Sequence, residues 1–248
     1  MAIKLDAAGV NAKVDHPIVD GDAHVLEARL TLLDYVKKIA GPEIALKFEN
    51  MEHPWKYQDV QPIFWGMPSG AHSIDRATAM LPKLFKERLD EAGIDVGIVY
   101  STACLPLMHV RDDELRQVGH RALNHLLADI FNEVGDRLIP NAVIPMFSPE
   151  EAIAELDHAV NELGFKAAVF GTEVRLPIPE VAAKDPDLAK YTQRIYPVAL
   201  DALHDYDPVW QRCMDLKIPV GAHTACRGGG ARHSSPSNFV FNHLGGFA

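Results

Sequence analysis

The chain has 248 residues, a formal net charge of −10 at pH 7 and 48% hydrophobic residues. A chain of this length can bury a full core as one large α/β unit, so we treat residues 1–248 as a single domain. The acidic balance, without a cluster of lysine or arginine, argues against a nucleic-acid partner.

No secretion signal or membrane span is predicted. Met1 to Val14 lacks the basic start and the apolar segment of a signal peptide. No stretch reaches the length of a membrane-spanning helix. The three cysteines have unrelated spacings, which suits free thiols in a reducing compartment. We therefore expect a cytoplasmic protein without a membrane partner.

Strand-like and helix-like patterns alternate along the chain. Apolar runs predict six strands, at 18–25, 96–100, 138–146, 167–170, 219–223 and 238–242. Helical spacing of apolar residues and capping signals predict helices at 79–92, 112–134 and 148–163, and a further one from 207. Repeated βα units with nearly continuous apolar strands are typical of a parallel sheet with helical crossovers.

Residues 41–78 interrupt this alternation. The stretch from Gly41 to Gly70 is rich in proline, tryptophan and glycine, and long irregular connections are usually either functional or disordered. We interpret 41–78 as an insertion that forms an ordered flap over the site. Trp65 is a candidate for lining a substrate pocket there, although Trp55 and Trp65 could also simply cover core edges.

The order of elements predicts a TIM-like (β/α) barrel. An open, doubly wound sheet is the alternative, but no glycine-rich phosphate loop follows any strand. Six βα units are visible before Ala248, whereas a closed barrel has eight strands. We therefore expect an incomplete barrel. Its exposed sheet edge would invite pairing with another chain, which predicts a homo-oligomer.

The first strand carries a carboxylate and an imidazole two residues apart, Asp22 and His24. Residues i and i+2 of a strand point to the same face, so these side chains would project together from its C-terminal end. Two later strand ends also carry histidine, His223 and His243. His223 alone would more often be a buried, hydrogen-bonded histidine. Its position, equivalent to those of the other two, favours a divalent-metal site built from these donors.

Several short motifs carry a family resemblance. They are Asp20 to His24, Leu89 to Asp95, Glu162 to Lys166, Tyr206 to Trp210, Ile218 to Thr224, and His243 to Gly246. In this order the chain resembles the amidohydrolase-related branch of metal-dependent hydrolases that contains aminocarboxymuconate-semialdehyde decarboxylase and γ-resorcylate decarboxylase. The resemblance covers most of residues 15–248. It implies a TIM-like barrel with one divalent metal at the C-terminal face of the strands.

The resemblance also implies roles for individual residues. It gives Asp22, His24 and His223 to the metal, and His243 to acid–base chemistry or to binding the activated water or substrate. Many relatives have His-x-His on the first strand. Here Asp22 takes the first place, as in the acidic-x-His variant found among decarboxylases. The family's further aspartate follows the eighth strand, beyond Ala248, so we expect an incomplete ligand set and weakened metal affinity.

This site would serve two chemistries. A metal held by three protein ligands keeps open positions for water or substrate oxygens. In a hydrolase, a nearby base completes the activation of water. In a non-oxidative decarboxylase, an acid such as His243 or Asp22 would deliver a proton to the carbon that loses its carboxylate. Arg175 and Arg227 are candidates for binding the substrate carboxylate.

The leading prediction is a metal-dependent hydrolase or carboxy-lyase. It would act on a small carboxylated substrate, aromatic ones included, through a single divalent ion, with zinc expected first and manganese second. Two alternatives stay open. One is a catalytically impaired, truncated barrel that acts as a binding or regulatory module. The other is an unrelated α/β binding protein whose histidines are structural.

Overall fold

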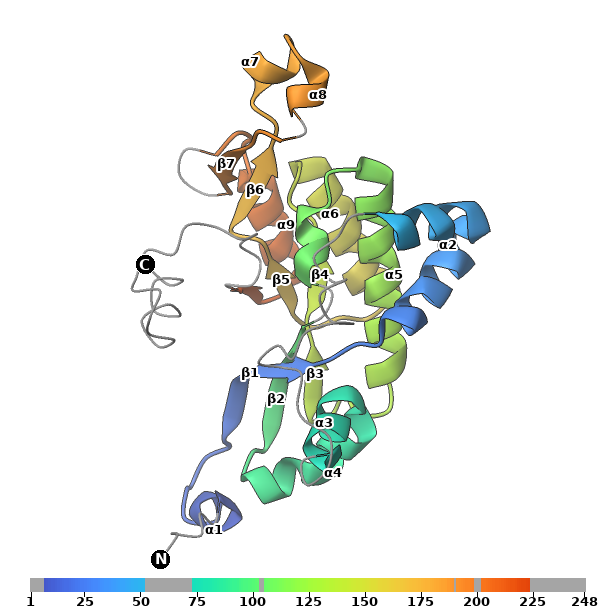
Figure 1. Cartoon of the computed structure of the whole chain (residues 1–248). Helices are drawn as coiled ribbons and strands as arrows, with labels where there is room; N and C mark the ends of the chain where they lie inside the picture. The colour runs from blue at the N-terminus through green and yellow to red at the C-terminus, as the bar shows by residue number, and fades with distance from the viewer. Residues whose placement is uncertain (1–6, 52–72, 103–104, 190, 199–201, 224–248) are drawn as a thin grey trace, which may run out of the picture.

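The computed structural model describes residues 7–51, 73–102, 105–189, 191–198 and 202–223 (Figure 1). The strands are β1 (Val19–Val25), β2 (Val96–Ser101), β3 (Leu138–Pro140), β4 (Ala142–Ile144), β5 (Ala168–Phe170), β6 (Glu173–Leu176), β7 (Arg194–Pro197) and β8 (Val220–Ala222). The helices are α1 (Ala7–Asn11), α2 (Arg29–Asn50), α3 (Ser73–Met80), α4 (Pro82–Ala92), α5 (Asp113–Phe131), α6 (Pro149–Asp157), α7 (Pro179–Ala182), α8 (Pro186–Ala189) and α9 (Asp207–Leu216). A 3₁₀-helix, η3 (Leu105–His109), and a π-helical turn, η4 (His158–Glu162), complete the order.

Six strands pair in parallel as two ladders of three, β1-β2-β3 and β4-β5-β8. Asn141, between β3 and β4, connects the ladders. Its backbone N–H and its side-chain amide both donate to the Val99 carbonyl in β2, at 2.9 and 3.1 Å. The next residue, Ala142, donates to the Ala167 carbonyl beside β5. One predicted strand over 138–146 is therefore two short strands, because the sheet turns at Asn141 and each half pairs with a different neighbour.

The series of parallel strands is curved. Neighbouring strands lie about 4.8 Å apart, so four steps from β1 to β8 would span about 19 Å in a flat sheet. Two imidazole side chains cannot bridge that distance. Yet the Nε2 atoms of His24 in β1 and His223 directly after β8 lie 3.1 Å apart. A mixed α/β structure with this curvature is what a TIM-like barrel requires. The number of βα units stays a prediction. So does the sixth strand at 238–242, which lies outside the described residues.

The core lies between the parallel strands and the helices that Figure 1 shows beside them, α5 and α6. Of the apolar stripe predicted within 112–134, five members are buried and two, Val118 and Ile130, are partly buried against the core. The buried members are Leu115, Ala122, Leu123, Leu126 and Leu127. The helix begins where its apolar pattern predicts, and the structure adds a cap there, since the Asp112 carboxylate accepts from the Leu115 N–H at 2.9 Å. Ser148 caps α6 in the same way, accepting from the Glu151 N–H.

Two helix predictions need correction. The helix expected over 79–92 is divided at Leu81, which is extended (φ −120°, ψ 101°), because a residue before proline is disfavoured in the helical region. The irregular structure expected from residue 41 is wrong over 41–50, which continue α2 after a kink at Gly41 (φ 85°). Pro42 stands in the first turn after the kink, where its missing N–H costs no bond.

The remainder of the predicted flap is only partly described. Residues 73–78 belong to α3, and the Ala79 carbonyl accepts from the Leu26 N–H just beyond β1, at 2.7 Å. Residues 52–72, with Trp65, lie outside the described residues. The flap over the site therefore stays a prediction.

An antiparallel hairpin, β6–β7, was not predicted from the sequence. Figure 1 shows that it carries α7 and α8 at the end of the molecule opposite α1. Among the residues that the structure describes, no helix combines the length and the apolar character needed to cross a membrane.

Candidate metal centre

A bulge in β1 presents Asp22. The register between β1 and β2 runs from Asp20 opposite Gly97 to Ala23 opposite Val99, so β1 has one residue more than its partner over this stretch. Bulges re-aim side chains and occur near functional sites. The Asp22 side chain is 76% exposed, whereas that of His24 is only 10% exposed. The predicted pairing of the two therefore holds at the strand end, but with unequal burial.

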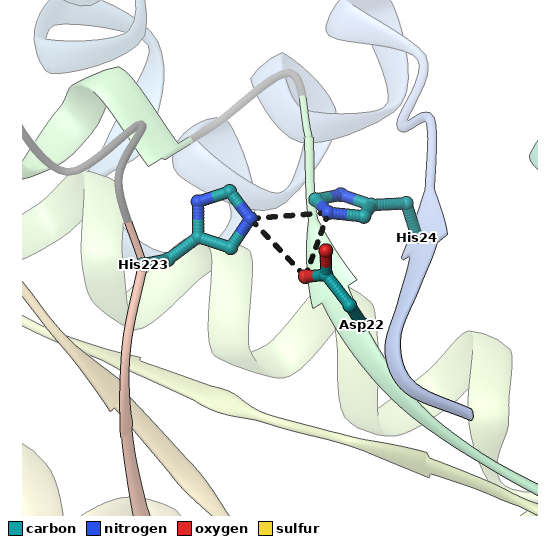
Figure 2. A group of neighbouring side chains, drawn as sticks. All are labelled: Asp22, His24 and His223. Atoms are coloured by element: carbon teal, nitrogen blue, oxygen red, sulfur yellow. Dashed lines mark hydrogen bonds and ion pairs between the residues drawn. The ribbon is translucent and has the colours of Figure 1, made fainter. Parts of the chain in front are cut away.

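Asp22, His24 and His223 meet at one point (Figure 2). The Nε2 atoms of the two histidines are 3.1 Å apart. Asp22 Oδ1 lies 3.5 Å from the Nε2 atom of each histidine. In Figure 2 the carboxylate and both imidazole nitrogens point toward a common space between β1 and the end of β8. The structure thus brings together the three predicted metal ligands.

These distances fit a shared ion better than a direct ion pair. Ligand atoms about 2.1 Å from one ion are about 3.0 Å apart along an octahedral edge and about 3.4 Å apart along a tetrahedral edge. The observed separations of 3.1 and 3.5 Å match those edges. A charge-assisted hydrogen bond between histidine and carboxylate would be shorter than 3.5 Å. Two imidazoles and one carboxylate form a donor set suited to zinc or manganese.

The electrostatics favour neutral imidazoles. Burial lowers the pKa of His24 below its usual value, and the neighbouring Asp22 only partly offsets this effect. Burial also lowers the pKa of His223, and repulsion from His24 lowers it further. A neutral imidazole has the lone pair that a metal ligand needs. The site is therefore prepared to bind a cation without first releasing protons from its histidines.

Thr102 orients His24, and sequence reasoning missed it. Its Oγ1 lies 2.9 Å from His24 Nδ1. With the proton on Nδ1, His24 donates to this hydroxyl, and Nε2 keeps its lone pair toward Asp22 and His223. Thr102 is fixed in turn by its backbone N–H, which donates to the buried Glu27 carboxylate at 3.3 Å. Its position directly after β2 is a signal that could have identified it.

Tyr100 in β2 lies against both histidines. Its ring centroid is 5.9 Å from that of His24 and 5.2 Å from that of His223. The hydroxyl comes so close to Gly221 in β8 that a Cβ on that residue would lie 2.6 Å from it. Gly221 thus leaves room for the tyrosine beside the site. The sequence pattern did not indicate Tyr100 either, because that pattern consisted of histidines and carboxylates at strand ends.

Of the other predicted site residues, the structure describes only Arg175. Arg175 follows the fourth predicted strand, as expected, and lies within β6, where its buried guanidinium donates to Glu173 Oε1 at 2.8 and 3.1 Å. This charge is paired with a carboxylate of its own strand. His243, Arg227 and Trp65 lie outside the described residues, so their roles stay predictions.

Comparison with known proteins gives a family match. The sequence model of the amidohydrolase family matches residues 53–247. No curated protein matches the sequence significantly.

Three solved structures have a similar fold. A dihydroxybenzoic acid decarboxylase from Polaromonas sp. JS666, with bound manganese and the inhibitor 2-nitroresorcinol, has a TM-score of 0.50 and 19% identity, over 90% of this chain and 51% of its own. A 5-carboxyvanillate decarboxylase from Novosphingobium aromaticivorans, with manganese and 4-hydroxy-3-methoxy-5-nitrobenzoic acid, has a TM-score of 0.52 and 15% identity, over 90% and 53%. An amidohydrolase from Mycobacterium avium subsp. paratuberculosis has a TM-score of 0.52 and 19% identity, over 85% and 58%. The chain thus spans about half the length of the solved structures it matches, and at these identities the likeness shows the fold alone.

Proposed function

The chain belongs to the amidohydrolase family, and from this premise we propose that it is a metal-dependent hydrolase or carboxy-lyase centred on Asp22, His24 and His223. The observation that carries the proposal is the convergence of these three donor atoms at 3.1 to 3.5 Å. The donors come from opposite edges of the series of parallel strands. A centre at the C-terminal strand ends is where barrel enzymes place their chemistry.

Of the two chemistries, we favour non-oxidative decarboxylation of an aromatic carboxylic acid. Two of the three structures of similar fold are decarboxylases that hold manganese together with a substituted aromatic ligand. The mixed nitrogen and oxygen donor set of this chain accommodates manganese as well as zinc. When bound, the ion would polarise substrate oxygens or lower the pKa of a water molecule.

The chain's own groups would position the substrate and handle the proton. When the bond to the carboxylate breaks, its electron pair stays on the ring carbon and CO₂ leaves, so that carbon must gain a proton. Asp22, largely exposed at the centre, and His243 are the proposed proton donors. Tyr100 would form a wall beside the two histidines. Arg227, Trp65 and, after release from Glu173, Arg175 are proposed to contact the substrate.

The test combines metal analysis with turnover. Purified protein should contain about one zinc or manganese ion per chain at this centre, and the His24→Ala variant should lose that ion. The control variant His16→Ala removes an exposed histidine and should keep the metal. Release of CO₂ from 2,6-dihydroxybenzoate or 5-carboxyvanillate would support the carboxy-lyase, and opening of lactones would support the hydrolase. Bound metal without turnover favours a binding module, and no bound metal contradicts the proposal.

Three further points belong to the same proposal. Zinc is proposed before manganese, and metal analysis decides between them. A cytoplasmic location and a homo-oligomeric state also stay predictions. Light scattering of the purified chain tests the oligomer, and a monomer at all concentrations would contradict it.

A further inference from the structure

A second pair of histidines lies in the helical layer. His125 is in α5, and His158 is the first residue of the π-helical turn η4. Their Nε2 atoms are 3.1 Å apart, the same separation as between His24 and His223. The ring centroids are 5.1 Å apart, with 48° between the ring planes. The His158 side chain is 9% exposed, whereas His125 is only partly buried and is open to an ion from solvent.

A carboxylate orients this pair. The Nδ1 atom of His158 lies 2.9 Å from Glu162 Oε2. With the proton on Nδ1, His158 donates to this carboxylate, and the lone pair of Nε2 is directed at His125. Histidines that bind metals characteristically donate their other ring N–H to a carboxylate or carbonyl. Glu162 reaches His158 across a π-helical turn, and such turns occur frequently at functional sites.

The charges around the pair favour a neutral imidazole that can accept a cation. Burial is the main cause that lowers the pKa of His125, with further lowering by His158, Arg121 and Lys38. Asp129 acts in the opposite direction. Arg121 is itself paired with a carboxylate on α6 at 2.8 Å, so its charge is largely compensated.

We propose that His125 and His158 form a second transition-metal site, in which Glu162 orients His158 and water completes the coordination. Two imidazole nitrogens without a carboxylate or carbonyl ligand select zinc, nickel or copper over magnesium or calcium. The ion would cross-link η4 to α5, and it would stabilise the native chain because it binds the folded state and not the unfolded one. With two protein ligands instead of three, this site is weaker than the first. The inference does not depend on the proposed catalytic function.

The experiment titrates the full chain with Zn²⁺ by calorimetry in a His24→Ala background, which removes the first site. We expect one equivalent to bind in His24→Ala, and this equivalent to disappear in His24→Ala/His125→Ala and in His24→Ala/His158→Ala. The matched control His24→Ala/His16→Ala should keep it. With Cu²⁺ in the same background, electron paramagnetic resonance should show nitrogen hyperfine coupling from two imidazoles.

A second variant separates metal binding from a plain hydrogen bond between the rings. Glu162→Gln should weaken Zn²⁺ binding about 10-fold or more, as expected for loss of an orienting carboxylate. His158 is buried, so its replacement risks unfolding the chain. If the variant with His158→Ala does not fold, the variant with His125→Ala decides the result, once circular dichroism has confirmed that it is folded. The proposal is overturned if His24→Ala binds neither Zn²⁺ nor Cu²⁺, or if the bound equivalent survives removal of His125.

Discussion

The Nε2 atoms of His24 and His223 lie 3.1 Å apart, although 199 residues separate these histidines in the chain. One follows the bulge of β1 and the other follows β8, so their contact exists only when the parallel strands are assembled and curved. An ion held between them would bind the folded chain and not the unfolded one. Metal binding at this centre would therefore be coupled to folding.

Replacing His24 by alanine should abolish metal binding at this centre and leave the metal-free fold nearly intact. His24 is a strand-end side chain that faces the centre, and the core does not depend on it for packing. Added manganese, which the two-histidine site at His125 and His158 does not select, should raise the melting temperature of the wild type and not that of His24→Ala. Thermal melts with and without metal measure this difference. Gross unfolding of metal-free His24→Ala would instead indicate a structural histidine.

Thr102→Val should weaken metal binding without unfolding the chain. The change removes the hydroxyl 2.9 Å from His24 Nδ1 and frees the ring to rotate or change tautomer. Loss of such an orienting partner typically costs 10- to 100-fold in metal affinity, and we expect about 10-fold here. Thr102→Ser keeps the hydroxyl and should retain most of the affinity. Equal affinities for the two variants, measured by competition with a chelator, would contradict the orienting role.

Gly221→Ala should disturb the centre through Tyr100. The new Cβ would lie 2.6 Å from the tyrosine hydroxyl, and the displaced ring packs against both histidines. Overpacking of this kind costs about 1–3 kcal/mol. Tyr100→Phe in the same chain should recover much of the loss in chemical denaturation.

The matched control for this pair is Gly21→Ala, because no atom lies within 4 Å of a Cβ on Gly21. We expect it to change stability little. If Gly221→Ala were as stable as Gly21→Ala, the close contact between β2 and β8 would be disproved.

Arg116→Ala should destabilise the fold strongly. The guanidinium is 2% exposed, forms two 2.8 Å bonds to Glu151 and lies over the Phe147 ring at 3.6 Å. Its removal leaves a buried carboxylate without its cation, which typically costs about 3–5 kcal/mol. Arg212→Ala breaks the partly exposed pair with Asp157 and should cost about 1 kcal/mol or less. Urea denaturation compares the two, and equal losses would contradict the argument.

Asp95 should make stability depend on acidic pH. Its carboxylate accepts from the Ile18 N–H at 2.7 Å and from Asn11 at 3.1 Å, and the first of these bonds is the main cause that lowers its pKa below 3.8. A lowered native pKa gives stability that is present above pH 3.8 and is lost as the pH falls through the native value. The free energy of unfolding of the wild type should therefore exceed that of Asp95→Asn at pH 7. The difference should vanish once the pH falls below the native pKa of Asp95. A difference that is constant with pH would contradict this linkage.

The sequence determined the features that depend on neighbours within a few residues. The apolar period of α5, its start near Asp112 and the Ser148 cap of α6 were all predicted, because helix periodicity and capping involve side chains three or four positions apart. The strand ends with Asp22, His24 and His223 were likewise recognised from local pattern. Their role as ligands remains a proposal.

Tertiary structure decided how those segments meet. The division of one predicted strand at Asn141 depends on which neighbour each half pairs with, and local residue pattern does not record that choice. The same holds for Thr102 and Tyr100, whose contacts with His24 cross between strands far apart in sequence. Side-chain convergence over 199 residues is set by sheet curvature and core packing. These are properties of the whole assembled sheet, and so only the structure reveals the centre.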